Sequence, residues 1–246
     1  MEPEFEQEII RLANFYCTGC FIANENPNVA KVCNTASFSF IDTGVKKIGV
    51  TNNHVLEKFE KKKNQHNDVV FYVGNKKFDP FKILIDRSAD SDLATFDFDT
   101  ISLDSINPDL AFCSPTSWPP TRPDEGDVVV YSGFPGQFAQ KDNVPEIVFN
   151  SVGIIESIHS VDGEKFTLQR DLENDPNIQQ KSGHIDINEF HNQGGFSGTL
   201  ILKVPHHSKI TTVVPIGIFF QGIDTLSQIS YIRHLDYINS DGTLKT

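Results

Sequence analysis

The sequence predicts an all-β protein, a barrel or a sandwich, with one helix near each end of the chain. Short segments that alternate apolar and polar residues recur along most of its 246 residues, as in strands with one buried face. Turn-forming residues such as Thr43-Gly44 and Gly74-Asn75 separate these segments. Strands and long helices do not alternate, which disfavours a parallel α/β sheet.

The elements follow in order along the chain. A first helix is expected within residues 4–16, where Ile9, Leu12, Ala13 and Tyr16 share one helical face. Segments rich in β-branched and aromatic residues come next and are expected to form strands. They span residues 36–44, 46–56, 68–86, 92–98, 128–136, 146–158, 165–170, 198–204 and 212–222. A second helix is expected at residues 230–238, where apolar residues recur at helical spacing.

The composition excludes several classes of protein. The chain has 21 Lys and Arg against 33 Asp and Glu, a net charge of −12, which argues against nucleic acid or an anionic membrane as a partner. Its 38% hydrophobic residues, with 20 Phe, are too many for a disordered chain. No apolar segment reaches the roughly 18 residues of a membrane span. The acidic start MEPEFEQEII lacks the features of a secretory signal, so we expect a soluble, cytoplasmic protein.

Four cysteines are present: Cys17, Cys20, Cys33 and Cys113. Cys17 and Cys20 form a CxxC pair, and a zinc site made from three cysteines and a histidine is one interpretation. A second CxxC pair is missing, and cysteine is often fully buried, so buried free thiols are the favoured interpretation. We therefore expect neither a metal nor a cofactor.

Three local patterns carry the residue types of nucleophilic catalysis. His54 follows a β-rich segment in GVTNNHVL, Asp92 begins a strand in SDLATFDF, and Ser197 lies among glycines in QGGFSGTLIL. A serine hydroxyl is a weak nucleophile unless a neighbouring base takes its proton, and histidine is the usual base. The order His, Asp, Ser in an all-β chain is that of chymotrypsin and differs from that of subtilisin or the α/β-hydrolases.

On these residues the chain resembles the trypsin-like (chymotrypsin-fold) serine peptidases, and the bacterial HtrA-type and other intracellular forms more than the secreted digestive enzymes. The resemblance spans about residues 35–238. TNNHVL is similar to the family's T-A-x-H-V, SDLA to D-[IL]-A, and GGFSGTL to G-x-S-G-[GT]-[PL]. The resemblance implies two antiparallel six-stranded β-barrels with the site in the cleft between them.

The resemblance also implies a division of the chain. The stretch 114–123 holds four prolines in ten residues and cannot continue inside a sheet, so it is the expected linker. Residues 1–34 would form the N-terminal helix and a lead-in strand, and 35–113 the barrel with His54 and Asp92. Residues 124–246 would form the barrel with Ser197 and the substrate pocket, followed by the C-terminal helix.

The resemblance assigns a role to each site residue. His54 is expected to be the general base, Asp92 to hold its tautomer, and Ser197 to be the nucleophile. The backbone N–H groups of Gly195 and Ser197 are expected to form the oxyanion hole. Position-matching with the family gives these candidate substrate-binding residues: His191, Asn192, Phe219, Phe220 and Gln221.

Substrate preference and control stay open at this stage. His191 favours acidic or amide side chains at P1, whereas Asp186, Glu189 and the net charge favour basic ones. Phe196 stands where digestive members carry the Asp that pairs with a new amino terminus, and no matching activation site is found. We therefore expect control other than zymogen cleavage, for example through a regulatory protein partner.

Together these features predict a serine endopeptidase with restricted specificity, acting on a protein or peptide. One alternative is a catalytically idle module of the same fold that binds a protein partner, which the presence of all three catalytic residue types disfavours. The other is an unrelated β-domain, with zinc bound through its cysteines.

Overall fold

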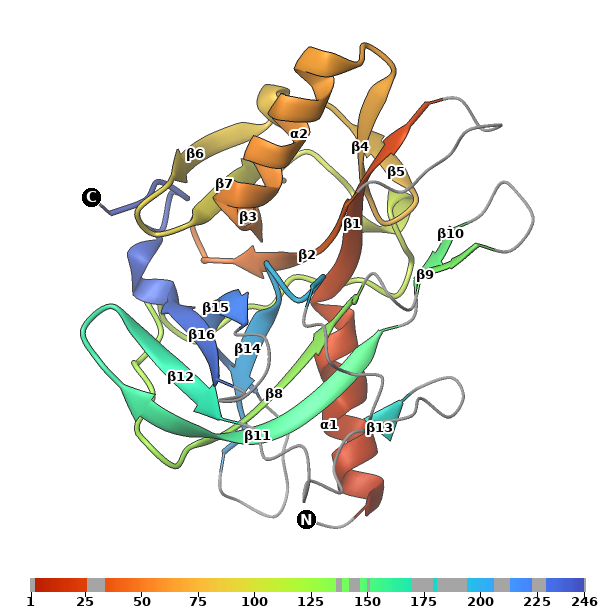
Figure 1. The fold of residues 1–246 in the computed structure, drawn as a ribbon. Helices are drawn as coiled ribbons and strands as arrows, with labels where there is room; N and C mark the ends of the chain where they lie inside the picture. The colour runs from red at the N-terminus through yellow and green to blue at the C-terminus, as the bar shows by residue number, and fades with distance from the viewer. Residues whose placement is uncertain are drawn as a thin grey trace.

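A computed structural model describes residues 3–25, 34–135, 139–141, 147–149, 151–169, 179–180, 194–205, 213–222 and 229–245. Two antiparallel seven-stranded sheets make up most of this part of the chain (Figure 1). The fold is therefore all-β with two packed sheets, as the sequence predicts. Neither of the two α-helices in the described residues combines the length and the apolar character of a membrane span.

The first half of the chain contains both helices. Its elements are α1 (Pro3–Phe15), β1 (Cys17–Asn24), β2 (Asn34–Asp42), β3 (Lys47–Thr51), α2 (Asn53–Gln65), β4 (Val69–Val73), β5 (Lys76–Phe78), β6 (Leu84–Ser88) and β7 (Leu93–Asp97). The second half is built from strands. They are β8 (Val128–Gly133), β9 (Ala139–Lys141), β10 (Ile147–Phe149), β11 (Val152–Val161), β12 (Lys165–Gln169), β13 (Gln179–Gln180), β14 (Leu200–Lys203), β15 (Val214–Gly222) and β16 (Ile229–His234).

The first sheet has the order β5-β4-β1-β2-β3-β7-β6. Alternate residues of its strands point into a core of phenylalanine rings, because successive side chains of a strand face opposite sides. Phe38 lies at its centre, with ring centroids 5.2 Å from Phe96 and 5.4 Å from Phe40. The sheet curls around this core as a half-barrel, since no pairing in the described residues closes it, and together with the second sheet it is consistent with the expected double barrel.

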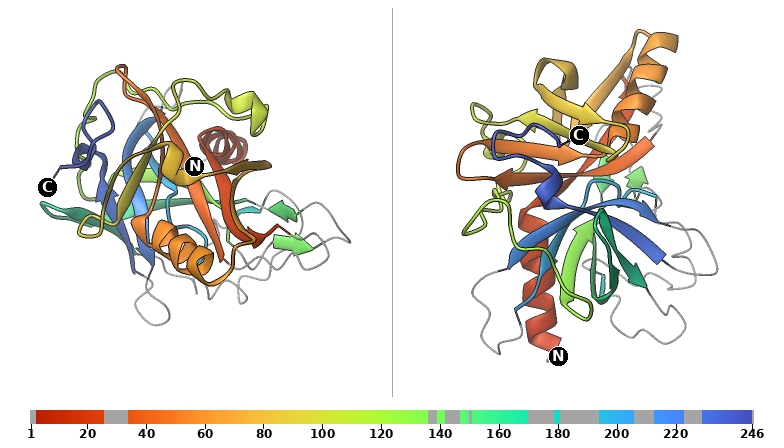
Figure 2. Two further views of the ribbon diagram at one scale, coloured as in Figure 1. Left: turned by 90° about the horizontal axis from the view of Figure 1, so that it is seen from above. Right: turned by 90° about the vertical axis from the view of Figure 1, so that its left-hand side faces the viewer.

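The second sheet closes into a barrel. Its order is β12-β16-β15-β14-β8-β11-β13, and a further pairing of β11 with β12 completes a ring of six strands. The rings of Tyr131, Phe166, Phe196 and Phe219 fill its core together with Leu, Ile and Val. This barrel agrees with the expectation from the resemblance, and Figure 2 shows the two sheets as layers with α1 along the second.

The prediction of a helix near the C-terminus is wrong. Residues 229–234 form β16, which pairs with β12 on one side and β15 on the other, and only a 3₁₀ turn follows at Leu235–Tyr237. The apolar residues of this segment fit helical spacing, but pairing with two strands satisfies its backbone groups and decides the structure. The strand expected over 46–56 also stops early, at Thr51, because α2 begins at Asn53.

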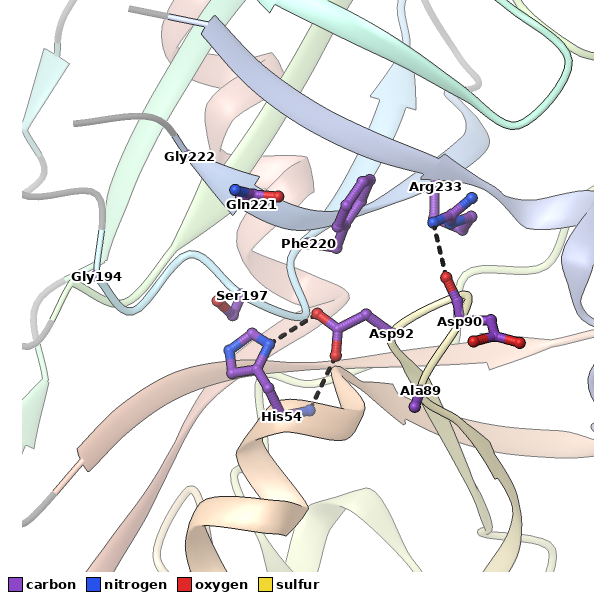
Figure 3. Close-up of a pocket in the computed structure, with 10 residues that line it drawn as sticks. All are labelled: His54, Ala89, Asp90, Asp92, Gly194, Ser197, Phe220, Gln221, Gly222 and Arg233. Atoms are coloured by element: carbon purple, nitrogen blue, oxygen red, sulfur yellow. Dashed lines mark hydrogen bonds and ion pairs between the residues drawn. The ribbon is translucent and has the colours of Figure 1, made fainter. Parts of the chain in front are cut away.

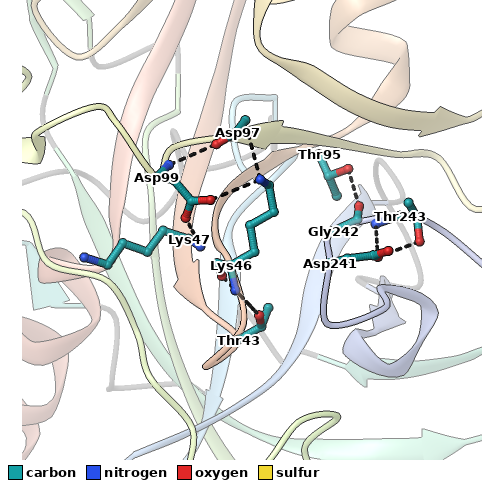
Figure 4. A network of polar contacts seen from close by, with 9 residues as sticks. All are labelled: Thr43, Lys46, Lys47, Thr95, Asp97, Asp99, Asp241, Gly242 and Thr243. Atoms are coloured by element: carbon teal, nitrogen blue, oxygen red, sulfur yellow. Dashed lines mark hydrogen bonds and ion pairs between the residues drawn. The ribbon is translucent and has the colours of Figure 1, made fainter.

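Two segments tie the sheets together. Ile9, Ile10 and Ala13 of α1 are buried in a cluster that takes residues from both sheets. The C-terminal residues cross back to the first sheet, where Thr43 Oγ1 donates to Ser240 O (2.6 Å) and Thr95 Oγ1 to Gly242 O (2.6 Å). The second of these bonds is drawn in Figure 4, beside the ion pairs that Lys46 makes with two aspartates.

Candidate active site

His54 lies at the start of α2, directly after strand β3. Asn52, two residues before it, is the N-cap residue, is fully buried and donates from Nδ2 to Asp92 O (2.7 Å). The Asn53 N–H donates to the same carbonyl (3.3 Å). The turn from strand to helix thereby fixes the backbone of His54 against the loop that carries Asp92.

Asp92 lies between β6 and β7 and is the only described residue other than glycine with positive φ, at 52°. Aspartate tolerates this left-handed conformation better than most residues. Its Oδ1 accepts the His54 N–H (2.9 Å), and its Oδ2 accepts from His54 Nδ1 (2.7 Å). The carboxylate therefore meets the N-terminal end of the 13-residue helix α2, where the helix dipole favours negative charge.

The contact with Asp92 determines what the imidazole can do. A carboxylate only accepts hydrogen bonds, so its contact with Nδ1 requires the proton of a neutral His54 to sit on Nδ1. Nε2 is then unprotonated and can accept a proton. Figure 3 shows the Ser197 side chain beside this ring. In the described part of the chain no hydrogen bond joins the two residues.

Ser197 lies in the tight loop that leads into β14. Gly195 and Gly198 on either side of it have φ of +111° and +91°, a backbone region that residues with a Cβ rarely adopt. A Cβ on Gly198 would lie 2.2 Å from Ser37 O. Glycine at 198 is thus required both by conformation and by the close approach of strand β2.

Strand β2 of the first sheet holds this loop of the second. The Ser37 N–H donates to Ser197 O (2.8 Å), and Ser37 Oγ donates to Gly195 O (2.7 Å). Ser39 Oγ donates to Gly198 O (2.7 Å). Sequence reasoning missed Ser37 and Ser39. Their signal is the alternation of serine with phenylalanine in ASFSF, which places small hydroxyls on the strand face opposite the phenylalanine core.

The two expected oxyanion donors are available. Among the described residues, no acceptor is found for the backbone N–H of Gly195 or of Ser197. The next two N–H groups are paired, Gly198 with Phe219 O (2.9 Å) and Thr199 with Phe196 O (2.9 Å). The loop is therefore held by its neighbouring groups, while these two N–H groups have no partner in the part of the chain that the structure describes.

The start of α2, the loop with Asp92 and the loop with Ser197 line one pocket of about 600 Å³. Its lining residues, drawn in Figure 3, are His54, Ala89, Asp90, Asp92, Gly194, Ser197, Phe220, Gln221, Gly222 and Arg233. The structure thus brings together the three catalytic candidates and two of the substrate-binding candidates, Phe220 and Gln221.

One described substrate-binding candidate, Phe219, does not line the pocket. The side chain of Phe219 faces the barrel core, is 1% exposed, and packs against Tyr131 and Phe196. Neighbouring strand residues face opposite sides, so only Phe220 is turned outward. His191 and Asn192 lie outside the described residues.

Phe196, next to the nucleophile candidate, is a core residue. It is 1% exposed, and its ring lies 5.8 Å from Tyr131 and 5.7 Å from Phe219 between centroids. Gly133 of β8 lies beneath it, so close that a Cβ there would be 2.3 Å from Phe196 Cδ1. The side chain anchors the loop by apolar packing and has no group that could form an ion pair.

The cysteine pair does not form a shared site. Cys17 and Cys20 are three residues apart in β1, which directs their side chains to opposite faces of the sheet. Burial raises the pKa of Cys17 to about 11 and that of Cys20 further. Within the described ranges, no group of three metal-ligating side chains is found. Cys33 lies outside those ranges.

The comparisons with known proteins give little beyond this geometry. No protein-family model matches the chain, and no curated protein matches it significantly in sequence. Among solved structures, the inactive form of a serine-to-alanine mutant of Rv3671c from M. tuberculosis H37Rv aligns with 95% of this chain and 88% of its own. The sequence identity is 12% and the TM-score 0.48.

Proposed function

We propose that this chain is a serine endopeptidase in which Ser197 is the nucleophile, His54 the general base and Asp92 the group that orients the base. One observation carries the proposal. The three side chains, taken from both sheets, line a single pocket, and Asp92 bonds Nδ1 of His54 at 2.7 Å. The backbone N–H groups of Gly195 and of Ser197 itself, which have no acceptor among the described residues, complete the set of groups that acyl transfer needs.

The proposed reaction has two halves. His54 Nε2 takes the hydroxyl proton as Ser197 Oγ forms a bond to the carbonyl carbon of the scissile peptide. The resulting oxyanion accepts hydrogen bonds from the N–H groups of Gly195 and Ser197, and collapse returns the proton to the leaving amine. Water, deprotonated by the same imidazole, then attacks the acyl-enzyme and releases the acid, regenerating Ser197.

The proposed substrate is an extended peptide that runs along β15. Phe219 donates to Thr199 O on one side, but beyond this bond no described strand pairs with residues 220–222 on that side. The other side of the strand is occupied by β16. A peptide main chain can add to such a free edge, where Phe220 and Gln221 would contact its side chains. We propose that this contact restricts specificity.

We further propose that the site forms without cleavage of the chain. Phe196 is buried in the barrel core and needs no new amino terminus as a partner. A separate protein partner that limits access to the pocket is the proposed form of control.

The test is labelling with a fluorophosphonate, which reacts with activated serines. We expect the wild-type protein to be labelled at Ser197, as located by mass spectrometry of the digested product, and Ser197→Ala to stay unlabelled. Ser160→Ala is a matched control, since Ser160 bonds Thr167 on β12 and should not alter labelling. If the folded wild type is not labelled, alone or after addition of cell lysate, the enzyme is excluded and the idle binding module is favoured.

A further inference from the structure

Arg233 of β16 lies at the edge of the pocket and is almost completely buried, with 7% of its surface exposed. We propose that Arg233 is a positioning residue: it fixes the loop that carries Asp92 to the second sheet and so sets the hydrogen bond between Asp92 and His54. The expected effect of Arg233 on turnover rests on the proposed function. Its expected effect on the hydrogen bond between Asp92 and His54 does not.

The guanidinium bonds directly to the loop before Asp92. Nε donates to Ser91 O (3.1 Å) and Nη2 to Asp90 O (3.3 Å), the second bond being drawn in Figure 3. These two carbonyls belong to the residues immediately before the acid. The bonds join residues more than 140 positions apart and cross from the barrel to the half-barrel.

The remaining contacts hold the guanidinium in place. Nη1 donates to Glu164 O (3.3 Å), and the carboxylate of Glu164 is 4.0 Å away with its side chain 74% exposed. The guanidinium lies over the rings of Phe220 and Tyr237, at 4.8 and 5.1 Å from their centroids. A buried cation has to be satisfied by such groups, and each contact fixes its position.

Arginine is the residue type that this place requires. Its planar guanidinium presents donors in a fixed fork and stacks on aromatic rings, whereas lysine offers a single point charge. The two adjacent carbonyls of Asp90 and Ser91 match the fork, and Phe220 and Tyr237 match its flat faces. A lysine could reach one carbonyl but not reproduce both bonds and the stacking.

The backbone of Asp92 shows why a second anchor matters. A residue with positive φ keeps that conformation only when its surroundings determine it. From the first sheet, Asn52 Nδ2 and the Asn53 N–H hold the Asp92 carbonyl. From the second sheet, Arg233 holds the two residues before it. Among the described residues, no other hydrogen bond from the second sheet reaches residues 90–92, so loss of Arg233 would leave the loop held from the first sheet.

The same guanidinium touches the pocket wall. Phe220, which lies under it, is one of the residues proposed to contact substrate. Arg233 therefore connects the substrate-facing strand β15 with the acid of the proposed triad. Its replacement should disturb the orientation of His54 first and the shape of the pocket second.

The experiment compares Arg233→Met and Arg233→Lys with wild type. The control is Arg122→Met, which removes an arginine that pairs with Asp236 and does not line the pocket. The first readout is the proton NMR signal of His54 Nδ1–H, which lies far downfield when this proton is shared with a carboxylate. The second is hydrogen exchange of the His54 backbone N–H, which donates to Asp92 Oδ1. Neither readout requires peptidase activity.

We expect Arg233→Met to lose or broaden the downfield signal and to exchange the His54 N–H faster, with Arg233→Lys intermediate and Arg122→Met unchanged. In the active protein kcat should fall about 10²-fold, the order of loss for an active-site group misplaced by 1 Å, with a smaller change in KM. Should Arg233→Met not fold, Arg233→Lys decides on the same readouts. Folded variants with the wild-type signal and exchange rate would overturn the positioning role, whatever the result of the labelling experiment.

Discussion

Replacing Gly133 by alanine should displace the loop that carries Ser197, because the added Cβ would press on Phe196 of that loop. The added Cβ would lie 2.3 Å from Phe196 Cδ1, 2.7 Å from Cε1 and 2.8 Å from Thr199 Oγ1. Carbon atoms pack at about 3.5–4.0 Å, so the ring has to move by about 1 Å or more. Overpacking of this kind costs about 1–3 kcal/mol of stability.

The displacement of the ring has a consequence for chemistry because Phe196 precedes Ser197. If the loop moves with the ring, the proposed oxyanion donors Gly195 and Ser197 leave their positions, and a shift of about 1 Å costs on the order of 10²-fold in rate. We therefore expect Gly133→Ala to lower the rate constant of fluorophosphonate labelling by this factor. Gly195 and Ser197 themselves are unaltered, so the loss of labelling rate would measure how strongly the packing of Phe196 holds the loop in place.

The control is Gly153→Ala, which overpacks the protein at another buried place. Its Cβ would lie 2.1 Å from Ile10 Cγ2, and the three nearest atoms all belong to Ile10 of α1. We expect a similar loss of stability in urea but a labelling rate close to wild type. Adding Phe196→Leu to Gly133→Ala should make room for the methyl group and recover part of the rate. Equal labelling rates for the two alanine variants would refute the reasoning.

Three further predictions concern the acid, a buried histidine and the thiols. Asp92→Asn should lower kcat by about 10⁴-fold, because an amide can donate to Nδ1 and favour the wrong tautomer; a loss of less than tenfold in steady-state kinetics would contradict the assigned role. Burial lowers the pKa of His234 from its ordinary 6.5, so the unfolded chain takes up a proton that the folded one does not. The free energy of unfolding should therefore fall as the pH drops from 7 towards 5.5, and His234→Gln should flatten this dependence in urea titrations. If the variant keeps the wild-type pH dependence, His234 is not the group responsible. Burial raises the pKa of Cys17 to about 11 and that of Cys113 to about 12. Iodoacetamide at pH 8 should therefore modify these two thiols only after denaturation, as followed by mass spectrometry. Rapid labelling of the native protein would show instead that the thiols are accessible.

The three catalytic candidates could be predicted because each is marked by its immediate sequence. A β-rich segment that ends in two asparagines positions His54 at the start of a helix, and glycines on both sides of Ser197 permit its tight loop. Asp92 is recognisable at the entry of a strand, although its positive φ is not. Such signals depend on a few neighbouring residues and do not require knowledge of which strands pair.

The parts that could not be predicted depend on contacts between distant segments. Ser37 meets Gly195 across 158 positions, and Arg233 meets Ser91 across 142. The segment after residue 229 fits a helix as well as a strand until its two partners, β12 and β15, are known. The pairing of β15 with β16 also shifts between Phe219 and Gln221, so the register along this strand could not be read from the sequence.

The proposed site is shared between two sheets, so its assembly is a question of how the sheets are joined. His54 and Asp92 come from the half-barrel and Ser197 from the closed barrel. Ser37 bonds the serine loop from the first sheet, and Arg233 bonds the Asp92 loop from the second. Each sheet thus holds the loop that carries the other sheet's part of the proposed site. Phe196 completes the arrangement by packing into the barrel core. Since these contacts need no new amino terminus, we expect control to act on access to the pocket and not on the assembly of the triad.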